Sequence, residues 1–221
     1  RAYIRGTAKL FNENGIDACA MNFRSCSGEM NLSYGCYHSG KTDDVLEVLK
    51  HITKDKGYRK VIIKGVSLGG NVALKLAGDN IGIPPELKAV IAVSTPCDLA
   101  GAADKIIGLR NFVYGKNFHV HLRKKIKAKQ QLFPERISDE MIQSIKNLRD
   151  FDEVYTSKAH GYKDADDYYE QCSSLKVLDN IKVPTLILNA KNDSFLSEKS
   201  YPYEIAKNHK YVYLETPKYG G

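Results

Sequence analysis

Apolar residues recur along this chain with two spacings, and the spacings predict helices that alternate with buried strands. Apolar positions three and four residues apart predict a helix over 43–56, which we expect Thr42 to cap and Gly57 to end. Short continuous apolar runs predict buried strands. Together the predicted helices lie at 7–14, ended by Gly15, and at 43–56, and the predicted strands at 16–22, 61–63, 89–94, 185–190 and 211–215. This alternation indicates a parallel sheet with helices on its faces.

A long insertion separates two of the predicted strands. About 90 residues lie between the strands that end near 94 and begin near 185, which is far longer than an ordinary loop. This sequence is rich in charged residues and reads as mostly helical. We therefore expect a single α/β domain over 1–221, with a core at about 1–98 and 180–221 and a helical cap inserted over about 99–179.

The pentapeptide Gly-Val-Ser-Leu-Gly at 65–69 links an apolar strand directly to an apolar helix. Gly-x-Ser-x-Gly in this context is the nucleophile elbow of serine hydrolases. Gly65 and Gly69 would allow the tight turn, and Ser67 would project above the edge of the sheet. The helix beginning near Leu68 would direct its backbone N–H groups and its positive dipole end toward a developing oxyanion. A chance occurrence of the pentapeptide is the alternative, and the flanking strand and helix argue against it.

A serine nucleophile needs a base and an acid that orients the base. In the hydrolase fold the acid and the base follow the serine in that order along the chain. Asp193 follows the buried strand at 185–190 and is our candidate acid, with Asp98 as the reserve. The alternative role for Asp193 is to cap a helical segment that begins near Ser197.

The base is harder to identify, because it should follow the last strand and no histidine occurs after His209. His209 itself precedes that strand and should lie at its wrong end. His38 follows the strand at 16–22 and could approach the site as a base, although we favour a structural, hydrogen-bonding role for it. The other histidines are at 51, 119, 121 and 160, on predicted helices or in the insertion.

The cysteines bear on redox state and metal binding. Their number is five, and no Cys-x-x-Cys spacing occurs, which disfavours both a disulfide framework and a zinc site. Reduced thiols in a cytoplasmic protein fit this pattern. Cys36 and His38 could share a metal ion, but without a second pair of ligands we set that interpretation aside. We expect no metal and no organic cofactor.

Positive charge is concentrated in one part of the chain. The net charge is +7, and the stretch from Lys105 to Pro134 contains no acidic residue. The basic tract at 105–129 is interpreted either as a solvated helix face, opposite an acidic segment at 150–170, or as a contact with a membrane surface or acidic groups. No nucleic-acid-binding module is recognisable, and no apolar run approaches the roughly 20 residues of a membrane span.

Several motifs together resemble one family, the YheT-like α/β-hydrolases, which include eukaryotic abhydrolase-domain lipases and yeast medium-chain ethyl ester synthase/esterases. The motifs that carry the resemblance are Asn-Phe-Arg-Ser-Cys-Ser-Gly-Glu at 22–29, Tyr-His-Ser-Gly at 37–40, Gly-Val-Ser-Leu-Gly-Gly-Asn at 65–71, Val-Ser-Thr-Pro at 93–96, Asp98-Leu99, Phe151-Asp152, Tyr168-Tyr169 and Pro-Lys-Tyr-Gly-Gly at 217–221. Similar proteins carry an Arg where this chain has Leu32 and a Pro where it has Ser194.

The resemblance implies that both ends of the protein extend beyond this sequence. In the family the last motif continues into the catalytic His, which would be the residue after Gly221. An upstream His-Gly loop that donates a second oxyanion N–H would precede Arg1.

These expectations combine into a serine hydrolase that cleaves carboxylic esters of short to medium chain length through an acyl-enzyme. Ser67 would attack the ester, the His after Gly221 would move the proton, Asp193 would orient that His, and the Leu68 N–H would stabilise the oxyanion. Water as acceptor gives a carboxylesterase, and an alcohol gives an ester synthase. Apolar residues at 109, 112, 113, 114 and 118 are expected to line the acyl pocket. An amidase or peptidase with the same triad, and a non-catalytic binding protein on this fold, remain alternatives.

Overall fold

The computed structural model describes residues 2–220, which form two compact units that are described one at a time. In the first unit, residues 1–31, helix α1 (Ala2–Glu13) is followed by Gly15 in the left-handed conformation at φ +72°. The predicted helix and its end at Gly15 are confirmed, but the helix begins at Ala2, five residues before the predicted start at Thr7. The predicted strand at 16–22 is wrong, because these residues pair with no strand in the described part of the chain. Ile16 is 45% exposed, so the segment has no buried face to stabilise a strand.

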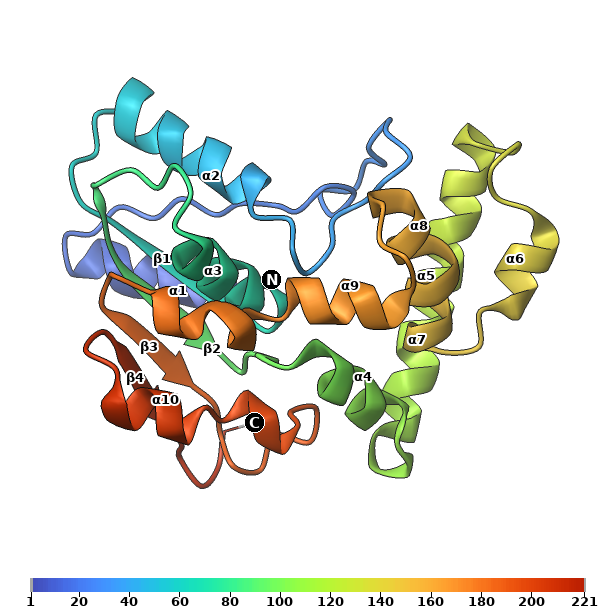
Figure 1. Cartoon of the computed structure of the whole chain (residues 1–221). Helices are drawn as coiled ribbons and strands as arrows, with labels where there is room; N and C mark the ends of the chain where they lie inside the picture. Colours follow the sequence, from blue (N-terminus) through green and yellow to red (C-terminus); the bar gives the residue numbers. More distant parts are fainter. Residues whose placement is uncertain (1, 221) are drawn as a thin grey trace. The chain divides into compact units, whose positions relative to one another are not determined.

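The second unit, residues 32–221, contains a four-stranded parallel sheet (Figure 1). Its strands are β1 (Val61–Val66), β2 (Leu87–Val93), β3 (Thr185–Leu188) and β4 (Val212–Glu215), in the order β1-β2-β3-β4. Gly65 pairs with Ala92, and Ala92 pairs with Ile187, so the carboxyl ends of β1, β2 and β3 reach the same edge of the sheet. The four strands predicted for this part of the chain, and their parallel arrangement, are confirmed.

Helices alternate with these strands as the sequence pattern predicted. They are α2 (Asp43–Lys50), which continues as the π-helix η1 (His51–Asp55), α3 (Leu68–Asp79) and α10 (Tyr203–Asn208). Gly57 ends the helical stretch at φ +74°, as predicted. The prediction that Thr42 caps the helix is wrong. Thr42 stands at the cap position, but its backbone is itself helical (φ −83°, ψ −27°) and its side chain makes no capping bond, whereas a capping side chain needs an extended backbone.

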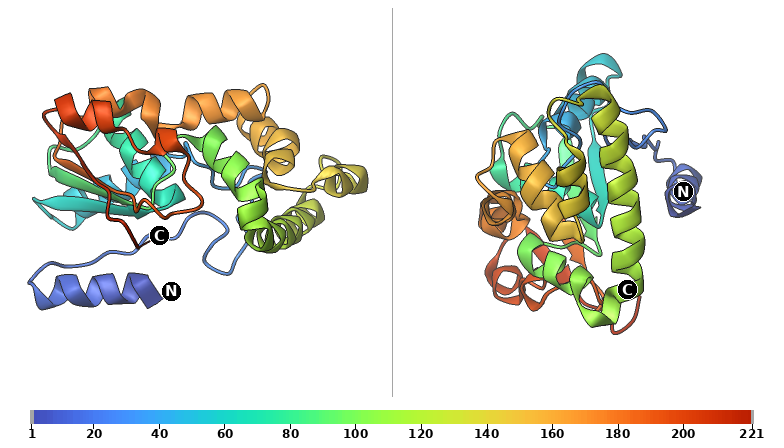
Figure 2. Two further views of the ribbon diagram at one scale, coloured as in Figure 1. Left: turned by 90° about the horizontal axis from the view of Figure 1, so that it is seen from below. Right: turned by 90° about the vertical axis from the view of Figure 1, so that its right-hand side faces the viewer.

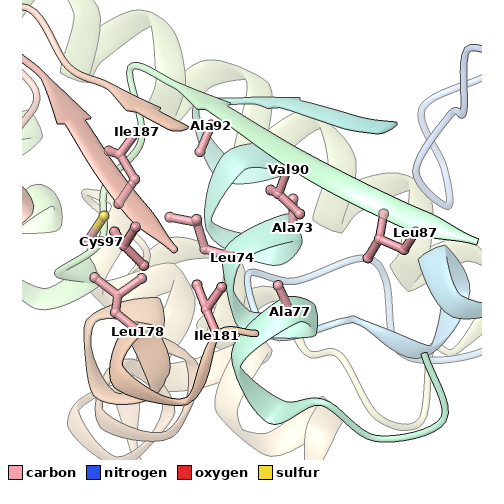
Figure 3. Close-up of a cluster of buried hydrophobic side chains, with 11 residues drawn as sticks. Ala73, Leu74, Ala77, Leu87, Val90, Ala92, Cys97, Leu178, Ile181 and Ile187 are labelled. Atoms are coloured by element: carbon pink, nitrogen blue, oxygen red, sulfur yellow. The ribbon is translucent and has the colours of Figure 1, made fainter. Parts of the chain in front are cut away.

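The core lies between the sheet and the helices on one of its faces (Figure 3). Leu74 of α3, Ala92 of β2 and Ile187 of β3 are completely buried there. The 3₁₀ segment η4 (Ser174–Asn180) packs against α3 and contributes the buried Leu178. Figures 1 and 2 show α3, η4 and α10 on the same face of the sheet. This packing holds the beginning of α3 against the carboxyl ends of the strands.

The insertion between β2 and β3 is helical, as predicted (Figure 1). Its elements are α4 (Leu99–Ile107), η2 (Leu109–Asn111), α5 (Phe112–Leu132), α6 (Asp139–Ser144), α7 (Leu148–Phe151), η3 (Asp152–Thr156), α8 (Ser157–His160), α9 (Ala165–Cys172) and η4. The division into a core and a cap stays a prediction. Among residues 2–220, no helix is long and apolar enough to cross a membrane.

Candidate active site

Ser67 occupies a sharp turn between β1 and α3. Its φ of 54° and ψ of −124° lie far from the conformations that residues other than glycine prefer, and such a backbone stores roughly 1–3 kcal/mol of strain. The turn is anchored because the Ser67 N–H donates to Val93 O at 2.9 Å and the Ser67 carbonyl accepts from Gly70 N at 2.9 Å. The Ser67 residue is exposed to solvent. The strand, turn and helix therefore have the geometry of a nucleophile elbow.

The glycines around Ser67 permit this geometry. A Cβ atom at Gly65 would lie 2.2 Å from the carbonyl oxygen of Gly69, which is backbone and cannot rotate away. A Cβ atom at Gly70 would lie 1.9 Å from Thr95 Oγ1. The need for glycine at 65 was foreseen from the tight turn. The need at 70 comes from the end of β2 and could not be read from the local pattern.

The backbone N–H of Leu68 lies at the N-terminus of α3, where the sequence predicted an oxyanion-binding group. Leu68 is the first residue of α3, so its N–H has no acceptor within the helix. The positive end of the helix dipole adds to the attraction for a negative oxygen. The geometry thus fits the predicted role of the Leu68 N–H.

Asp193 lies in the loop that follows β3. Its N–H donates to Ala190 O at 3.1 Å, and its Oδ1 accepts from Phe195 N at 3.0 Å. The carboxylate is half-buried and lies near the Tyr201 phenol, whose pKa is raised by burial and then by the Asp193 charge. With β2 between β1 and β3, the ends of these two strands are about 10 Å apart, a span that an imidazole between Ser67 and Asp193 can bridge.

Asp193 does not cap the helical segment near Ser197, which was its alternative role. The short 3₁₀ segment η5 (Glu198–Ser200) has Ser197 at its cap position. The reserve acid, Asp98, accepts from Ser197 Oγ at 2.8 Å, and its N–H donates to Ser200 Oγ at 3.4 Å. Asp98 therefore holds the loop after β2 against the η5 segment.

The chain that leaves β4 runs beside the loop of Asp193. Lys191 N donates to Pro217 O at 2.8 Å, and Asn189 N donates to Glu215 O at 3.0 Å. A Cβ atom at Gly220 would lie 3.9 Å from Ala190 Cβ. The segment from Pro217 to Gly220 therefore lies beside the acid loop.

His209 and His38, the two histidines weighed as a base near the strands, have structural contacts. His209 accepts from Tyr211 N and Val212 N through Nδ1, and its Nε2 lies 3.2 Å from Asp179 O, so it shapes the turn before β4, as its place in the sequence indicated. His38 is buried and accepts from Gly40 N at 3.2 Å. Burial, followed by the neighbouring His160 and Lys41, lowers the pKa of His38 to about 3. An imidazole with that pKa accepts a proton poorly, which favours the structural role.

Two buried asparagines hold the loops of the site, and the sequence analysis missed both. Asn189 Nδ2 donates to Thr95 O and Ser200 O, and its Oδ1 accepts from Thr95 N. Asn189 thus joins the loops after β2 and β3. Asn71, on α3, makes three similar bonds to backbone groups outside its helix. Since most of the partners are more than 30 residues away in the sequence, no local pattern could have revealed these roles.

A hollow of about 520 Å³ lies at the opposite end of the sheet. Its lining includes Gly78 and Asp79 at the end of α3 and His209 before β4. Ligands of open α/β sheets bind at the carboxyl ends of the strands. We therefore do not assign this hollow to the reaction at Ser67.

The apolar residues expected to line an acyl pocket lie largely on the surface. Leu109 is 95% exposed and Val113 is 78% exposed. Tyr114 packs against Phe195, with the ring centroids 5.1 Å apart. The prediction of a pocket lining is not supported for Leu109 and Val113, because their side chains are exposed to solvent where α4 is followed by α5.

Comparison with known proteins decides the family. The family model for the alpha/beta hydrolase fold matches residues 2–218. The chain belongs to the alpha/beta hydrolase fold family. In this fold the nucleophile precedes the acid along the chain. Ser67, which follows β1, and Asp193, which follows β3, have this order.

Curated relatives of this α/β-hydrolase include the YheT-like proteins that the motifs indicated. YheT of Escherichia coli (strain K12), which is named as an esterase, is 33% identical over 203 residues, covering 90% of this chain and 59% of YheT. Phospholipase ABHD3 of Mus musculus is 28% identical over 100% of the chain and 54% of the relative. Monoacylglycerol lipase of Saccharomyces cerevisiae (strain ATCC 204508 / S288c) is 26% identical, over 100% and 50%. The chain thus spans little more than half the length of these relatives.

Solved structures show the same fold. The Pyrococcus furiosus esterase Pf2001 superposes with a TM-score of 0.57 at 13% identity, covering 97% of this α/β-hydrolase and 65% of the esterase. A lipase-esterase related protein from Clostridium acetobutylicum ATCC 824 gives a TM-score of 0.52 at 17% identity, covering 98% and 80%. At such low identities the likeness shows the fold alone.

Proposed function

We propose that this α/β-hydrolase carries the nucleophile and the acid of an enzyme that cleaves carboxylic esters through an acyl-enzyme. The observation that carries the proposal is the strained backbone of Ser67, held between β1 and α3 at the carboxyl edge of the sheet. A residue in this conformation costs stability, so the surrounding structure has to maintain it, and such strain collects at functional sites. The names of the relatives, an esterase, a phospholipase and a monoacylglycerol lipase, support an ester substrate.

In the proposed reaction Ser67 Oγ attacks the carbonyl carbon while an imidazole accepts its proton. We place that imidazole in the residue after Gly221, because the segment after β4 runs beside the acid loop. Asp193 accepts a hydrogen bond from the imidazole and stabilises its cation. The oxyanion binds the Leu68 N–H, and the alkoxide leaves with the proton of the imidazolium. Water then attacks the acyl-enzyme, with the same imidazole as base, and releases the acid and Ser67.

The finer specificity is also part of the proposal. We propose esters with acyl chains of short to medium length, and an alcohol can replace water as acceptor and make a new ester. A series of p-nitrophenyl esters from acetate to palmitate measures the acyl preference, since each buried methylene stabilises the transition state by at most about 0.8 kcal/mol, which is about fourfold in kcat/KM. An optimum at palmitate would contradict the chain-length proposal while leaving the Ser67 assignment intact.

The assignment of Ser67 is tested with the protein in its full natural length. A fluorophosphonate probe should label Ser67, as shown by peptide mapping, and Ser67→Ala should lower kcat for p-nitrophenyl acetate by roughly 10⁴-fold or more. The matched control is Ser144→Ala, at an exposed helix end, which should keep full activity. A label on another serine, or ester hydrolysis that survives in Ser67→Ala, would refute the assignment. Comparison of an ester with the corresponding anilide separates an esterase from an amidase.

A further inference from the structure

A cluster of apolar side chains projects into solvent where α4 turns into α5. We call residues 107–120 the α4–α5 corner. Its exposed apolar side chains are Ile107 (39%), Leu109 (95%), Phe112 (53%), Val113 (78%), Tyr114 (66%), Phe118 (46%) and Val120 (62%). Single exposed apolar residues are ordinary, but seven within fourteen residues of sequence indicate an interaction surface. In the right-hand view of Figure 2, α5 faces the viewer along its length.

Exposed basic side chains surround the corner. They are Lys105, Arg110, Lys116, Lys124 and Lys127. Within residues 2–220, no ion pair joins any of these five to a carboxylate, although other lysines and arginines in the described chain form such pairs. These five side chains are therefore free of ion pairs with the acidic segment at 150–170 in the described chain, which agrees both with a solvated helix face and with a surface that binds acidic groups.

Three basic residues of the tract also contact other side chains or backbone groups of the protein. The Lys129 side chain is buried and donates to Ser33 O, and Lys125 lies over the Tyr37 ring at 4.1 Å from its centroid. Lys116 lies over the Phe112 ring at 4.6 Å. The outward face of α5 thus combines apolar and positive groups, while its inward face is fixed to the protein.

The corner is fastened to the loop of the candidate acid. Asn111 Nδ2 donates to Ser194 O at 2.7 Å, and Ser194 Oγ donates to Asn111 Oδ1 at 2.7 Å. Tyr114 packs on Phe195. Ser194 and Phe195 follow Asp193 directly, so a molecule bound at the corner lies next to the site.

We propose that the α4–α5 corner docks on the surface of an anionic lipid aggregate, from which the enzyme takes its ester. The proposal rests on the proposed function for the substrate, but the docking itself does not need catalysis. Leu109 and Val113 enter the acyl region, and Lys116 and its basic neighbours bind the lipid phosphates. A second copy of the chain fits less well, because two such faces would bring like charges together.

The experiment measures binding of the full-length protein to vesicles of phosphatidylcholine, with and without phosphatidylglycerol, by co-sedimentation at low and high salt. We expect binding to the anionic vesicles that weakens as salt rises, since exposed charges are screened. Leu109→Ser with Val113→Ser should lower the partition coefficient about tenfold. The matched control is Ile81→Ser, because Ile81 is 75% exposed on the same unit but outside the corner.

Two further readouts separate this proposal from the proposed function. The double variant should hydrolyse soluble p-nitrophenyl acetate at the parent rate, and Ser67→Ala should bind vesicles as the parent does. Lys116→Gln with Lys124→Gln should weaken binding at low salt and have little effect at high salt.

Equal binding to neutral and anionic vesicles, or undiminished binding by the Leu109 and Val113 variant, would overturn the docking proposal. A melting temperature lowered in that variant by several degrees, or its conversion from a dimer to a monomer, would also overturn it. Such results would show that another segment or a second copy covers the corner. Loss of ester hydrolysis activity from the parent, with vesicle binding retained, would count against the proposed function alone.

Discussion

Replacement of Asn71 by alanine tests how the nucleophile elbow is held. Asn71 is completely buried on the first turn of α3, four residues after Ser67. Its Nδ2 donates to Ser39 O at 3.0 Å and to Cys172 O at 2.9 Å, and its Oδ1 accepts from Ser174 N at 2.9 Å. One side chain therefore joins the elbow helix to two segments that are far away in the sequence.

The expected loss of stability follows from these three bonds. Alanine at 71 would leave two carbonyls and one N–H without this partner in a buried setting, and each such group costs about 1–3 kcal/mol. Some relaxation and water entry will offset part of this cost. We expect Asn71→Ala to lower the free energy of unfolding by about 3–5 kcal/mol, a large part of the ~5–15 kcal/mol that a domain of this kind has.

Urea unfolding followed by circular dichroism measures this difference. The matched control is Asn208→Ala, since Asn208 donates one exposed bond to Glu204 O at 3.0 Å. It should lose about 0.5 kcal/mol or less. A loss in Asn71→Ala of less than about 1 kcal/mol, close to that of the control, would refute the reasoning, because the three bonds would then contribute nothing beyond an exposed one.

Three other predictions follow from the buried polar groups and the tight elbow. Burial raises the pKa of Asp152 from 3.8 to about 6, so the folded state binds this proton more tightly than the unfolded chain. The stability that comes from the proton on Asp152 is present below about pH 4 and is lost as pH rises through about 6. Near pH 8, Asp152→Asn should therefore raise the free energy of unfolding by up to about 3 kcal/mol. Burial lowers the pKa of His38 from 6.5 to about 3, so stability is lost as pH falls below 6.5, and His38→Gln should flatten the melting temperature between pH 6.5 and about 4. An unchanged profile would contradict the burial of the imidazole. Gly70→Ala should cost about 1–3 kcal/mol in urea unfolding because its Cβ meets Thr95 Oγ1, and adding Thr95→Ala should restore part of that loss.

The sequence predicted the parts of the fold that depend on local patterns. β1, Ser67 and α3 combine an apolar strand, a turn that needs glycine and an apolar helix, and all of that information lies within 61–79. The other strands of the sheet are short apolar runs of the same kind. The alternation of strands with helices then left the parallel sheet as the natural arrangement.

The sequence predictions failed where the structure depends on contacts between distant residues or on the backbone conformation that the fold imposes. The segment 16–22 has a pattern acceptable for a strand, but a strand also needs a paired neighbour. Thr42 has the right residue type for a cap, but its helical backbone turns the hydroxyl away. The bonds of Asn111 to Ser194, and of Asn189 to Thr95, join loops more than 80 residues apart in the sequence. Such contacts appear only when the sheet has brought the loops together.

The insertion between β2 and β3 also has a consequence for the order of folding. β1 pairs with β2 across the helix α3, and β3 pairs with β4 across the short segment η5 and the helix α10, so each pair can close early. Val90 of β2, in contrast, pairs with Thr185 of β3 across the whole insertion. The longer loop adds only about 1 kcal/mol of closure entropy, but a ladder between such distant segments forms slowly. We expect two half-sheets to appear first, with Ser67 on one and Asp193 on the other. The candidate nucleophile and acid would then meet only in the final step of folding.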